Sequence, residues 1–183
     1  MDLTLKEIAE SIARLDGREV EAVHNQLRNP LLKALLRAKP NSRGKGSAAK
    51  FDQVELIRAR LLVTGGELFG LTTEQLSLIN DALSAPVQFG TIGRKVVQPN
   101  SFGEIHPATA LGALINGALA GEDWAIRLRY VRFPDGARDT LVWVKWSEWD
   151  DPETSRLSAG GFVAGSLTLN AAALIRPLVG VPE

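Results

Sequence analysis

Two short amphipathic patterns with a tight break between them open the chain, and they constrain its fold more than any other feature. Thr4, with Glu7 three positions later, is typical of a capping box at the start of a helix. The Asp16-Gly17 pair predicts that this helix ends in a turn. Between these signals, apolar side chains recur at helical spacing at Leu5, Ile8, Ile12 and Leu15.

A second helix is predicted over residues 18 to 29. Val20, Val23 and Leu27 lie on one stripe of this pattern, and Pro30 is expected to end it. Two short helices joined by a tight turn make a helix-turn-helix candidate.

The segment after Pro30 is rich in turn formers and cations. Residues 40 to 47 (PNSRGKGS) separate two arms, at 31 to 39 and 48 to 52, that contain apolar residues. We interpret this as a β-hairpin wing whose loop carries Arg43 and Lys45 between glycines, because small residues allow close approach to a phosphate backbone. Leu, Lys, Ala and Arg all favour helix, so residues 31 to 38 are alternatively a third helix. Periodicity does not choose between the two.

The chain has no net charge, but its charges are unevenly distributed. Residues 28 to 60 hold nine basic and two acidic side chains, a net charge of +7. Residues 1 to 60 carry +4 in total, and residues 61 to 183 carry −4. Such asymmetry predicts a polyanion partner for the basic part, and a solvated basic face is the alternative.

Two further helices are expected before a domain boundary. The first is capped by Asp52, carries Val54, Ile57, Leu61 and Leu62, and is expected to end near Gly65-Gly66, with residues 67 to 70 as a connection. Thr72 or Thr73 caps the next, with Leu76, Ile79 and Leu83 as its buried stripe. Pro86 then marks the boundary.

The second half of the chain follows an α+β pattern. A short strand is expected at residues 92 to 98 and an Ala-rich helix at 107 to 119. Residues 124 to 133 alternate apolar side chains with Arg127, Arg129 and Arg132, and a turn at 134 to 137 leads to a returning strand at 139 to 149. These arginines are either solvated or add phosphate contacts. Another strand is expected at 162 to 169, and Asn170 is expected to cap a final helix.

All four tryptophans lie on or beside this hairpin, which is more than a small core requires. Because aromatic residues are enriched in interfaces, we expect a homodimer or partner interface here. Its residues are Trp124, Trp143, Trp146 and Trp149.

The order of elements resembles the DNA-binding half of MerR-type winged-helix regulators, as found in phage and bacterial genomes. The resemblance rests on residues 5 to 13 (LKEIAESIA), 23 to 29 (VHNQLRN), 43 to 51 (RGKGSAAKF), 54 to 62 and 69 to 76 (FGLTTEQL), and it covers the first 83 residues. Two features depart from the family. Residues 23 to 26 stand where it has a Tyr-rich stretch, and residues 84 to 183 offer no long dimerisation helix.

The resemblance implies that the second helix enters the major groove of double-stranded DNA, with the wing on the backbone. Asn and Gln side chains pair with adenine and Arg pairs with guanine, which gives the polar face of this helix a chemical role. The expected DNA-binding residues are His24, Asn25, Gln26, Arg28, Lys33, Arg37, Lys39, Arg43, Lys45 and Lys50.

The sequence offers little for other classes of function. Without cysteine there is no thiolate nucleophile and no disulfide framework, and neither His24 nor His106 has a nearby metal-ligating partner. We therefore expect no metal, cofactor or enzymatic activity, and we expect the acidic cluster at residues 148 to 153 to be solvated. No apolar run approaches the length of a signal peptide or membrane span, so a cytoplasmic protein is expected.

These observations predict an α+β protein with a winged helix-turn-helix DNA-binding domain at residues 1 to 83. A smaller α+β domain with an antiparallel hairpin sheet, at 84 to 183, would mediate self-association or sensing. The expected function is sequence-specific transcriptional regulation. The alternative is a protein-interaction or phage assembly module that binds an acidic partner through its basic window. Whether the second domain takes a small-molecule effector is left open.

Overall fold

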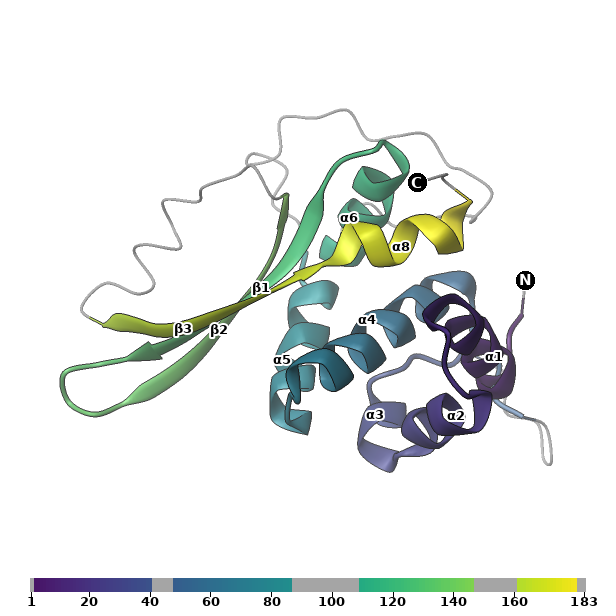
Figure 1. Ribbon diagram of the computed structural model, residues 1–183, viewed down its shortest axis with the longest axis horizontal. Coiled ribbons are helices and arrows are strands. Elements are labelled where there is room, and N and C mark those ends of the chain that lie inside the picture. The colour runs from purple at the N-terminus through teal and green to yellow at the C-terminus, as the bar shows by residue number, and fades with distance from the viewer. Residues whose placement is uncertain (1, 41–47, 87–108, 147–160, 181–183) are drawn as a thin grey trace. The chain divides into compact units, whose positions relative to one another are not determined.

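The computed structural model describes residues 2–40, 48–86, 109–146 and 161–180, which form helices and one antiparallel sheet (Figure 1). The expected α+β class is confirmed. Backbone contacts divide the chain into two compact units. The described residues of the N-terminal unit are 2–40 and 48–80, and those of the C-terminal unit are 81–86, 109–146 and 161–180. This division falls inside α5 (Thr73–Ser84), and the domain boundary after residue 83 stays a prediction.

Helix α1 (Leu5–Asp16) begins and ends as predicted. The backbone N–H of Thr4 donates to Glu7 Oε2 at 2.6 Å, and the N–H of Glu7 donates to Thr4 Oγ1 at 3.3 Å, which completes the capping box. Gly17 follows the helix with φ 64°, and the N–H of Arg18 donates to the Ala13 carbonyl at 2.9 Å. Because L side chains rarely adopt this left-handed conformation, glycine at this turn has a direct structural role.

The region around Pro30 takes the helical one of the two alternatives, but over a shorter range than residues 31 to 38. Helix α2 (Val20–Arg28) ends before Pro30 as predicted, and Pro30 begins a further helix, α3 (Pro30–Ala34). The side-chain oxygen of Asn29 accepts a hydrogen bond from the N–H of Leu31 at 3.0 Å, and proline suits the first helical position because no N–H is lost there. Residues 31–34 are therefore helical. The backbone hydrogen bond between the two predicted arms lies farther along, from the N–H of Lys39 to the carbonyl of Lys50.

Helix α4 (Gln53–Phe69) is longer than predicted. It begins at Asp52, whose side chain accepts from the N–H of Glu55 at 2.9 Å, but it continues through Gly65-Gly66 and ends at Gly70 with φ 59°. The predicted break and the connection at residues 67 to 70 are therefore wrong. Residues 61–64 before the two glycines are buried, and Glu67 after them pairs with Arg18 at 2.7 Å, so tertiary contacts outweigh the low helix propensity of glycine.

Thr72 precedes helix α5 and caps it with a second reciprocal pair of hydrogen bonds. The N–H of Thr72 donates to Gln75 Oε1 at 2.9 Å, and the N–H of Gln75 donates to Thr72 Oγ1 at 3.3 Å. This selects the first of the two threonines that the sequence offered as a cap.

Packing among the first four helices builds the core of the N-terminal unit. Helices α1, α2 and α4 contact one another, and α3 contacts α2. The side chains that are fully buried come from the predicted apolar stripes, among them Ile8, Ile12, Val23, Leu27, Ile57 and Leu61.

The C-terminal unit places two helices on one sheet. Strands β1 (Trp124–Arg132), β2 (Arg138–Trp146) and β3 (Phe162–Asn170) are antiparallel in the order β2-β1-β3 (Figure 1). Helix α6 (Ala110–Leu119) contacts β1 and β2, and α8 (Ala171–Val179) contacts β1 and α6. The predicted hairpin, the third strand and the Asn170 cap are confirmed. The strand expected at 92 to 98 and the acidic segment at 148 to 153 lie outside the described residues.

The alternation in β1 separates two faces of the sheet. Trp124, Ile126 and Leu128 are buried, whereas Arg127 and Arg129 are only half-buried. Since directly paired residues of antiparallel strands project to the same side, Leu169 and Leu167 of β3 join Ile126 and Leu128 on one face.

Helix α6 meets the sheet at Gly117. The Trp124 side chain is 5% exposed, and its Nε1 donates to Glu122 Oε2 at 2.9 Å. A Cβ atom at Gly117 would lie 1.9 Å from Trp124 Nε1 and 2.4 Å from its Cδ1. Only glycine therefore leaves room for the indole.

We predict that Gly117→Ala lowers the free energy of unfolding by about 1–3 kcal/mol, because it overpacks this contact. Without the clash, the same change inside a helix would stabilise by about 0.5–1 kcal/mol. Chemical denaturation followed by circular dichroism measures the difference.

Gly66→Ala is the matched control, since the nearest atoms to a Cβ there are 3.5 and 3.9 Å away, both on Leu76. We expect its stability to match or exceed that of the parent protein. Equal effects of the two substitutions would contradict the proposed role of the indole.

Candidate nucleic-acid interface

Helix α2 presents a polar face opposite its buried stripe. Val23 and Leu27 are fully buried, whereas Asn25 and Arg28 are exposed and His24 is half-buried. Asn25 and Arg28 are three residues apart, so they share one helix face. Of the four residues predicted on this helix, these two are therefore placed to reach a ligand.

Gln26 is exposed, but its side chain is held within the unit. Its Oε1 accepts a hydrogen bond from Arg18 Nη2 at 3.0 Å, and Arg18 Nη1 lies 2.7 Å from Glu67 Oε2 in α4. Arg18, which precedes α2, thus connects Gln26 in the last turn of α2 to Glu67 in α4.

Acidic side chains stand at the N-terminal end of α2. Glu19 is the N-cap residue and Glu21 lies in the first turn, and both are exposed. Negative charges favour the positive end of a helix dipole, but they oppose a phosphate at the same place. A backbone phosphate is therefore not expected at this end of the helix, and the cations of the site come from its other end and from the following segments.

Backbone hydrogen bonds pair the two arms of the predicted wing near their base. The N–H of Lys39 donates to the Lys50 carbonyl at 2.8 Å, and Phe51 and Leu3 exchange two backbone hydrogen bonds of 2.8 Å. Phe51 and Leu3 are buried at this bridge. Arg43 and Lys45, predicted at the loop tip, lie outside the described residues.

A buried carboxylate holds the first arm against α4. Glu55 is 4% exposed, and its Oε2 accepts from the backbone N–H of Arg37 at 2.9 Å. Its Oε1 accepts from Arg58 Nε at 2.9 Å, and Arg58 Nη1 donates to Asn80 Oδ1 at 2.7 Å. One side chain thus connects the arm that carries Arg37 to a buried guanidinium and to α5.

A second buried pair joins α4 to the end of α1. Arg60 is 5% exposed, and its Nη2 donates to Asp16 Oδ1 at 2.6 Å. Arg58 and Arg60 therefore do not contribute to a basic surface, although both belong to the window whose net charge is +7. The charge count overstated this surface because it took every cation as solvated.

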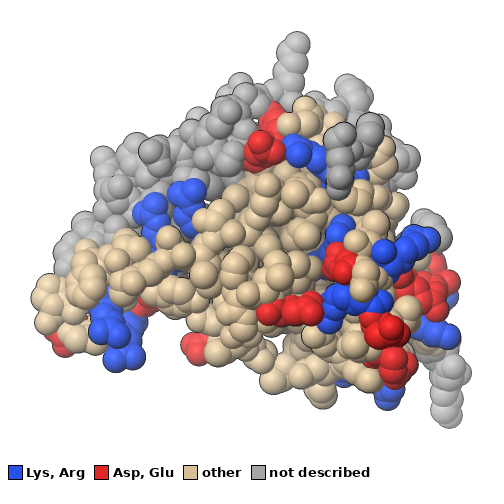
Figure 2. All heavy atoms as spheres, in the orientation of Figure 1, with Lys and Arg blue, Asp and Glu red and all other residues tan. Residues whose placement is uncertain are grey.

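The remaining described cations of the window are distributed over α2, α3 and the two arms. Arg28, Lys33 and Arg37 are exposed, and Lys50 is half-buried. Lys39 is paired with Asp2 through its Nζ. On the side shown in Figure 2, basic and acidic groups of the N-terminal unit are interspersed.

The Asp2–Lys39 pair changes the titration of both groups. The hydrogen bond from Lys39 lowers the pKa of Asp2 below its ordinary value of 3.8, and the same bond raises the pKa of Lys39 above 10.5. Since both charged forms are favoured, the pair fastens the N-terminal segment to the first arm across the neutral pH range.

A cavity of about 230 Å³ lies within the N-terminal unit between α2, α3, α4 and α5. Its apolar lining includes Leu32, Leu35, Leu62, Leu71 and Leu76, and Gln26 and Glu67 are among its polar residues. No local pattern in the sequence indicates this cavity, because it forms where four separate segments meet.

Trp124 lies in the core, so its side chain has almost no exposed surface for the interface that was expected there. Trp143 and Trp146 stand on β2, where Trp143 pairs with Arg127 and Trp146 with Trp124, and Trp149 lies outside the described residues. Within the described part of the chain, no three metal-ligating side chains come together.

Comparison with protein-family models and with curated proteins gave no match to this chain. The MerR-type resemblance therefore rests on the residues that suggested it. None of the described helices is both long enough and apolar enough to cross a membrane.

We predict that Glu55→Ala lowers the free energy of unfolding by about 3–5 kcal/mol, because it leaves a buried guanidinium without its carboxylate. The double variant Glu55→Leu/Arg58→Met removes both charges, so it should recover the part of this loss that comes from the unpaired guanidinium, whereas the Arg37 N–H stays without its acceptor. Urea denaturation of the full chain measures both.

Glu10→Ala serves as the control for this experiment. Glu10 forms an exposed pair with Lys6 at 3.9 Å, so its loss should change stability by less than about 1 kcal/mol. A Glu55→Ala variant as stable as Glu10→Ala would show that the buried carboxylate does not hold the arm.

The pH dependence of the Asp2–Lys39 pair has a definite sign. Because the pKa of Asp2 is lowered in the fold, the contribution of the pair to folding stability is present above pH 3.8 and disappears as the pH falls through the lowered pKa. In an NMR titration, Lys39→Met should return the pKa of Asp2 to its ordinary range. The pKa of Glu7, lowered chiefly by the backbone N–H of Thr4, should stay where it is.

Proposed function

We propose that this protein is a sequence-specific DNA-binding transcriptional regulator whose N-terminal unit is a winged helix-turn-helix of MerR type. The observation that carries the proposal is the exposed face of α2, where Asn25 and Arg28 stand opposite the buried Val23 and Leu27. Asparagine and arginine are the side chains that pair bidentately with adenine and guanine in the major groove.

The second support is the pairing at the base of the loop. In a winged helix, a hairpin after the recognition helix contacts the phosphate backbone. At the corresponding place in this chain, the Lys39–Lys50 hydrogen bond joins the two flanking segments, and the Leu3–Phe51 bridge ties the second segment to the residues before α1. Arg37 and Lys50 flank the loop base, where each neutralised phosphate releases counterions.

Sequence readout and phosphate contact predict different effects for two substitutions. Asn25→Ala removes a neutral base-pairing group, so it should reduce discrimination at one base pair by about 1–3 kcal/mol and leave the salt dependence unchanged. Lys33→Ala removes a charge, so it should weaken binding to all sequences alike and reduce the salt slope by about 1. Fluorescence anisotropy with labelled duplexes measures both quantities.

Lys6→Ala is the control, because it removes one exposed cation from α1 without changing α2. We expect its affinity to equal that of the parent protein. Selection of bound sequences from a random duplex library should precede these measurements, since it supplies the duplexes. A protein that shifts no duplex at low salt is not a DNA-binding regulator.

We also propose that the protein acts as a homodimer on paired half-sites, as DNA-binding proteins with one short recognition helix commonly do. The selected sequences should then contain two half-sites whose centres lie about 10 base pairs apart or a multiple of this. A single unpaired half-site would exclude the dimer.

A protein-interaction module is the competing function, and exposed apolar groups favour it. Leu31 is 57% exposed and Leu68 is 65% exposed, both in the helices that line the 230 Å³ cavity. This function predicts a stable complex with an acidic protein that forms without DNA and is weakened by Leu68→Ser. If the protein instead binds duplex DNA, and Leu68→Ser leaves its DNA affinity unchanged, the regulator is favoured.

A further inference from the structure

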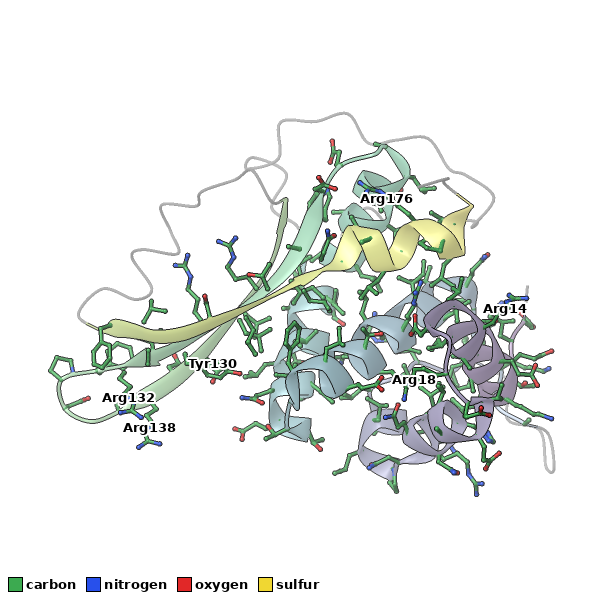
Figure 3. All side chains as sticks on the ribbon, viewed as in Figure 1. Arg14, Arg18, Tyr130, Arg132, Arg138 and Arg176 are labelled. Atoms are coloured by element: carbon green, nitrogen blue, oxygen red, sulfur yellow. The ribbon has the colours of Figure 1, made fainter. Side chains whose placement is uncertain are left out.

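Two arginines face each other at the far end of the β1–β2 hairpin. Arg132 and Arg138 are register partners, both are exposed, and Figure 3 shows them side by side below the sheet. Within the C-terminal unit, this end of the hairpin extends beyond α6 and α8 (Figure 1). The pair is therefore accessible on the face that the helices cover farther along the sheet.

This pairing is unfavourable for the hairpin on its own. Like charges directly opposite each other in an antiparallel pair destabilise it, and a carboxylate at either position would remove the repulsion. Within the described residues, neither guanidinium forms an ion pair. A local arrangement that opposes stability is expected where a ligand compensates for it.

The nearby carboxylates are engaged elsewhere. Asp135 Oδ1 accepts from the N–H of Ala137 at 2.9 Å in the turn, and Asp139 Oδ1 accepts from the N–H of Thr140 at 2.7 Å. Asp139 also follows Arg138 directly, so it projects to the opposite face of the strand. The two guanidiniums thus have no anion of the hairpin on their own face.

The hairpin is basic within an acidic half of the chain. Residues 124 to 140 hold four arginines and two aspartates, a net charge of +2, whereas residues 61 to 183 carry −4. Figure 2 shows basic groups gathered at the hairpin end.

Next to the pair, β1 is also held by β3. The Tyr130 ring lies over Gly165 of β3, where a Cβ would be 3.7 Å from Tyr130 Cδ2. Arg132 is two residues farther along the same face. Phe162 of β3 is the register partner of Arg132, so the pair stands on a three-stranded sheet. Paired guanidiniums match the oxygens of a phosphodiester.

We propose that Arg132 and Arg138 form a second phosphate-contact site on the duplex bound by the N-terminal unit. This inference rests on the proposed DNA-binding function and adds the C-terminal unit to it. Since both units belong to one chain, binding by one raises the effective concentration of the other at the same duplex.

The test compares Arg132→Gln/Arg138→Gln with the parent protein on a duplex of about 30 base pairs, about three helical turns. Each lost phosphate contact should weaken binding about tenfold near 0.1 M salt, and the double variant should reduce the salt slope by about 2. The matched control is Arg127→Gln, which removes one charge from the same strand but on the opposite face. It should leave affinity and slope unchanged.

Arg138→Glu separates binding from folding. It places a carboxylate opposite Arg132, so the midpoint of thermal unfolding should rise, while DNA affinity should fall by more than in Arg138→Gln. A variant that folds more stably yet binds more weakly supports the proposal. If it instead fails to fold, the glutamine variants carry the test alone.

The two proposals fail in different ways. If the parent protein binds duplex DNA and Lys33→Ala weakens it, but the double glutamine variant binds with unchanged affinity and slope, the hairpin site is wrong and the DNA-binding function stands. The site is also wrong if Arg127→Gln loses as much DNA affinity per charge as the double glutamine variant, because the effect is then one of net charge. If the parent protein binds no duplex, both proposals are wrong.

Discussion

The Glu55 carboxylate is the interaction on which the arrangement of the N-terminal unit depends. It lies inside the unit, and each of its two oxygens accepts a hydrogen bond, one from the Arg58 guanidinium and one from the Arg37 backbone. A buried charge requires such partners, since an unpaired one is strongly destabilising. The carboxylate therefore joins the loop arm to α4, and Arg58 extends the contact to Asn80 of α5. The position of the proposed DNA-contacting segment follows from these contacts.

Local signals accounted for much of the fold. The Thr4–Glu7 cap, the Asp16-Gly17 turn and the hairpin at residues 124 to 146 depend on neighbouring residues, so the sequence predicted them correctly. The errors came where distant residues decide. Gly65-Gly66 indicates a helix end, yet tertiary packing carries α4 through it to Phe69.

Charge was harder to interpret than apolar periodicity. The i,i+3 spacing of Glu55 and Arg58 offered a signal for one ion pair, but nothing local connects Arg60 with Asp16, which is 44 positions away. Arg18 and Glu67 were missed for the same reason. A cation count therefore bounds a basic surface from above, and only the fold shows which cations have internal partners.

The contact between Gly117 and Trp124 makes two positions behave as one. The indole occupies the volume that a side chain at 117 would take, so neither residue has an independent set of tolerated replacements. Substitutions at such neighbours have non-additive effects on stability. A larger residue at 117 or a smaller one at 124 destabilises the core more when it occurs alone than when both are present. Any route by which this core acquires a larger residue at 117 must begin with a smaller one at 124.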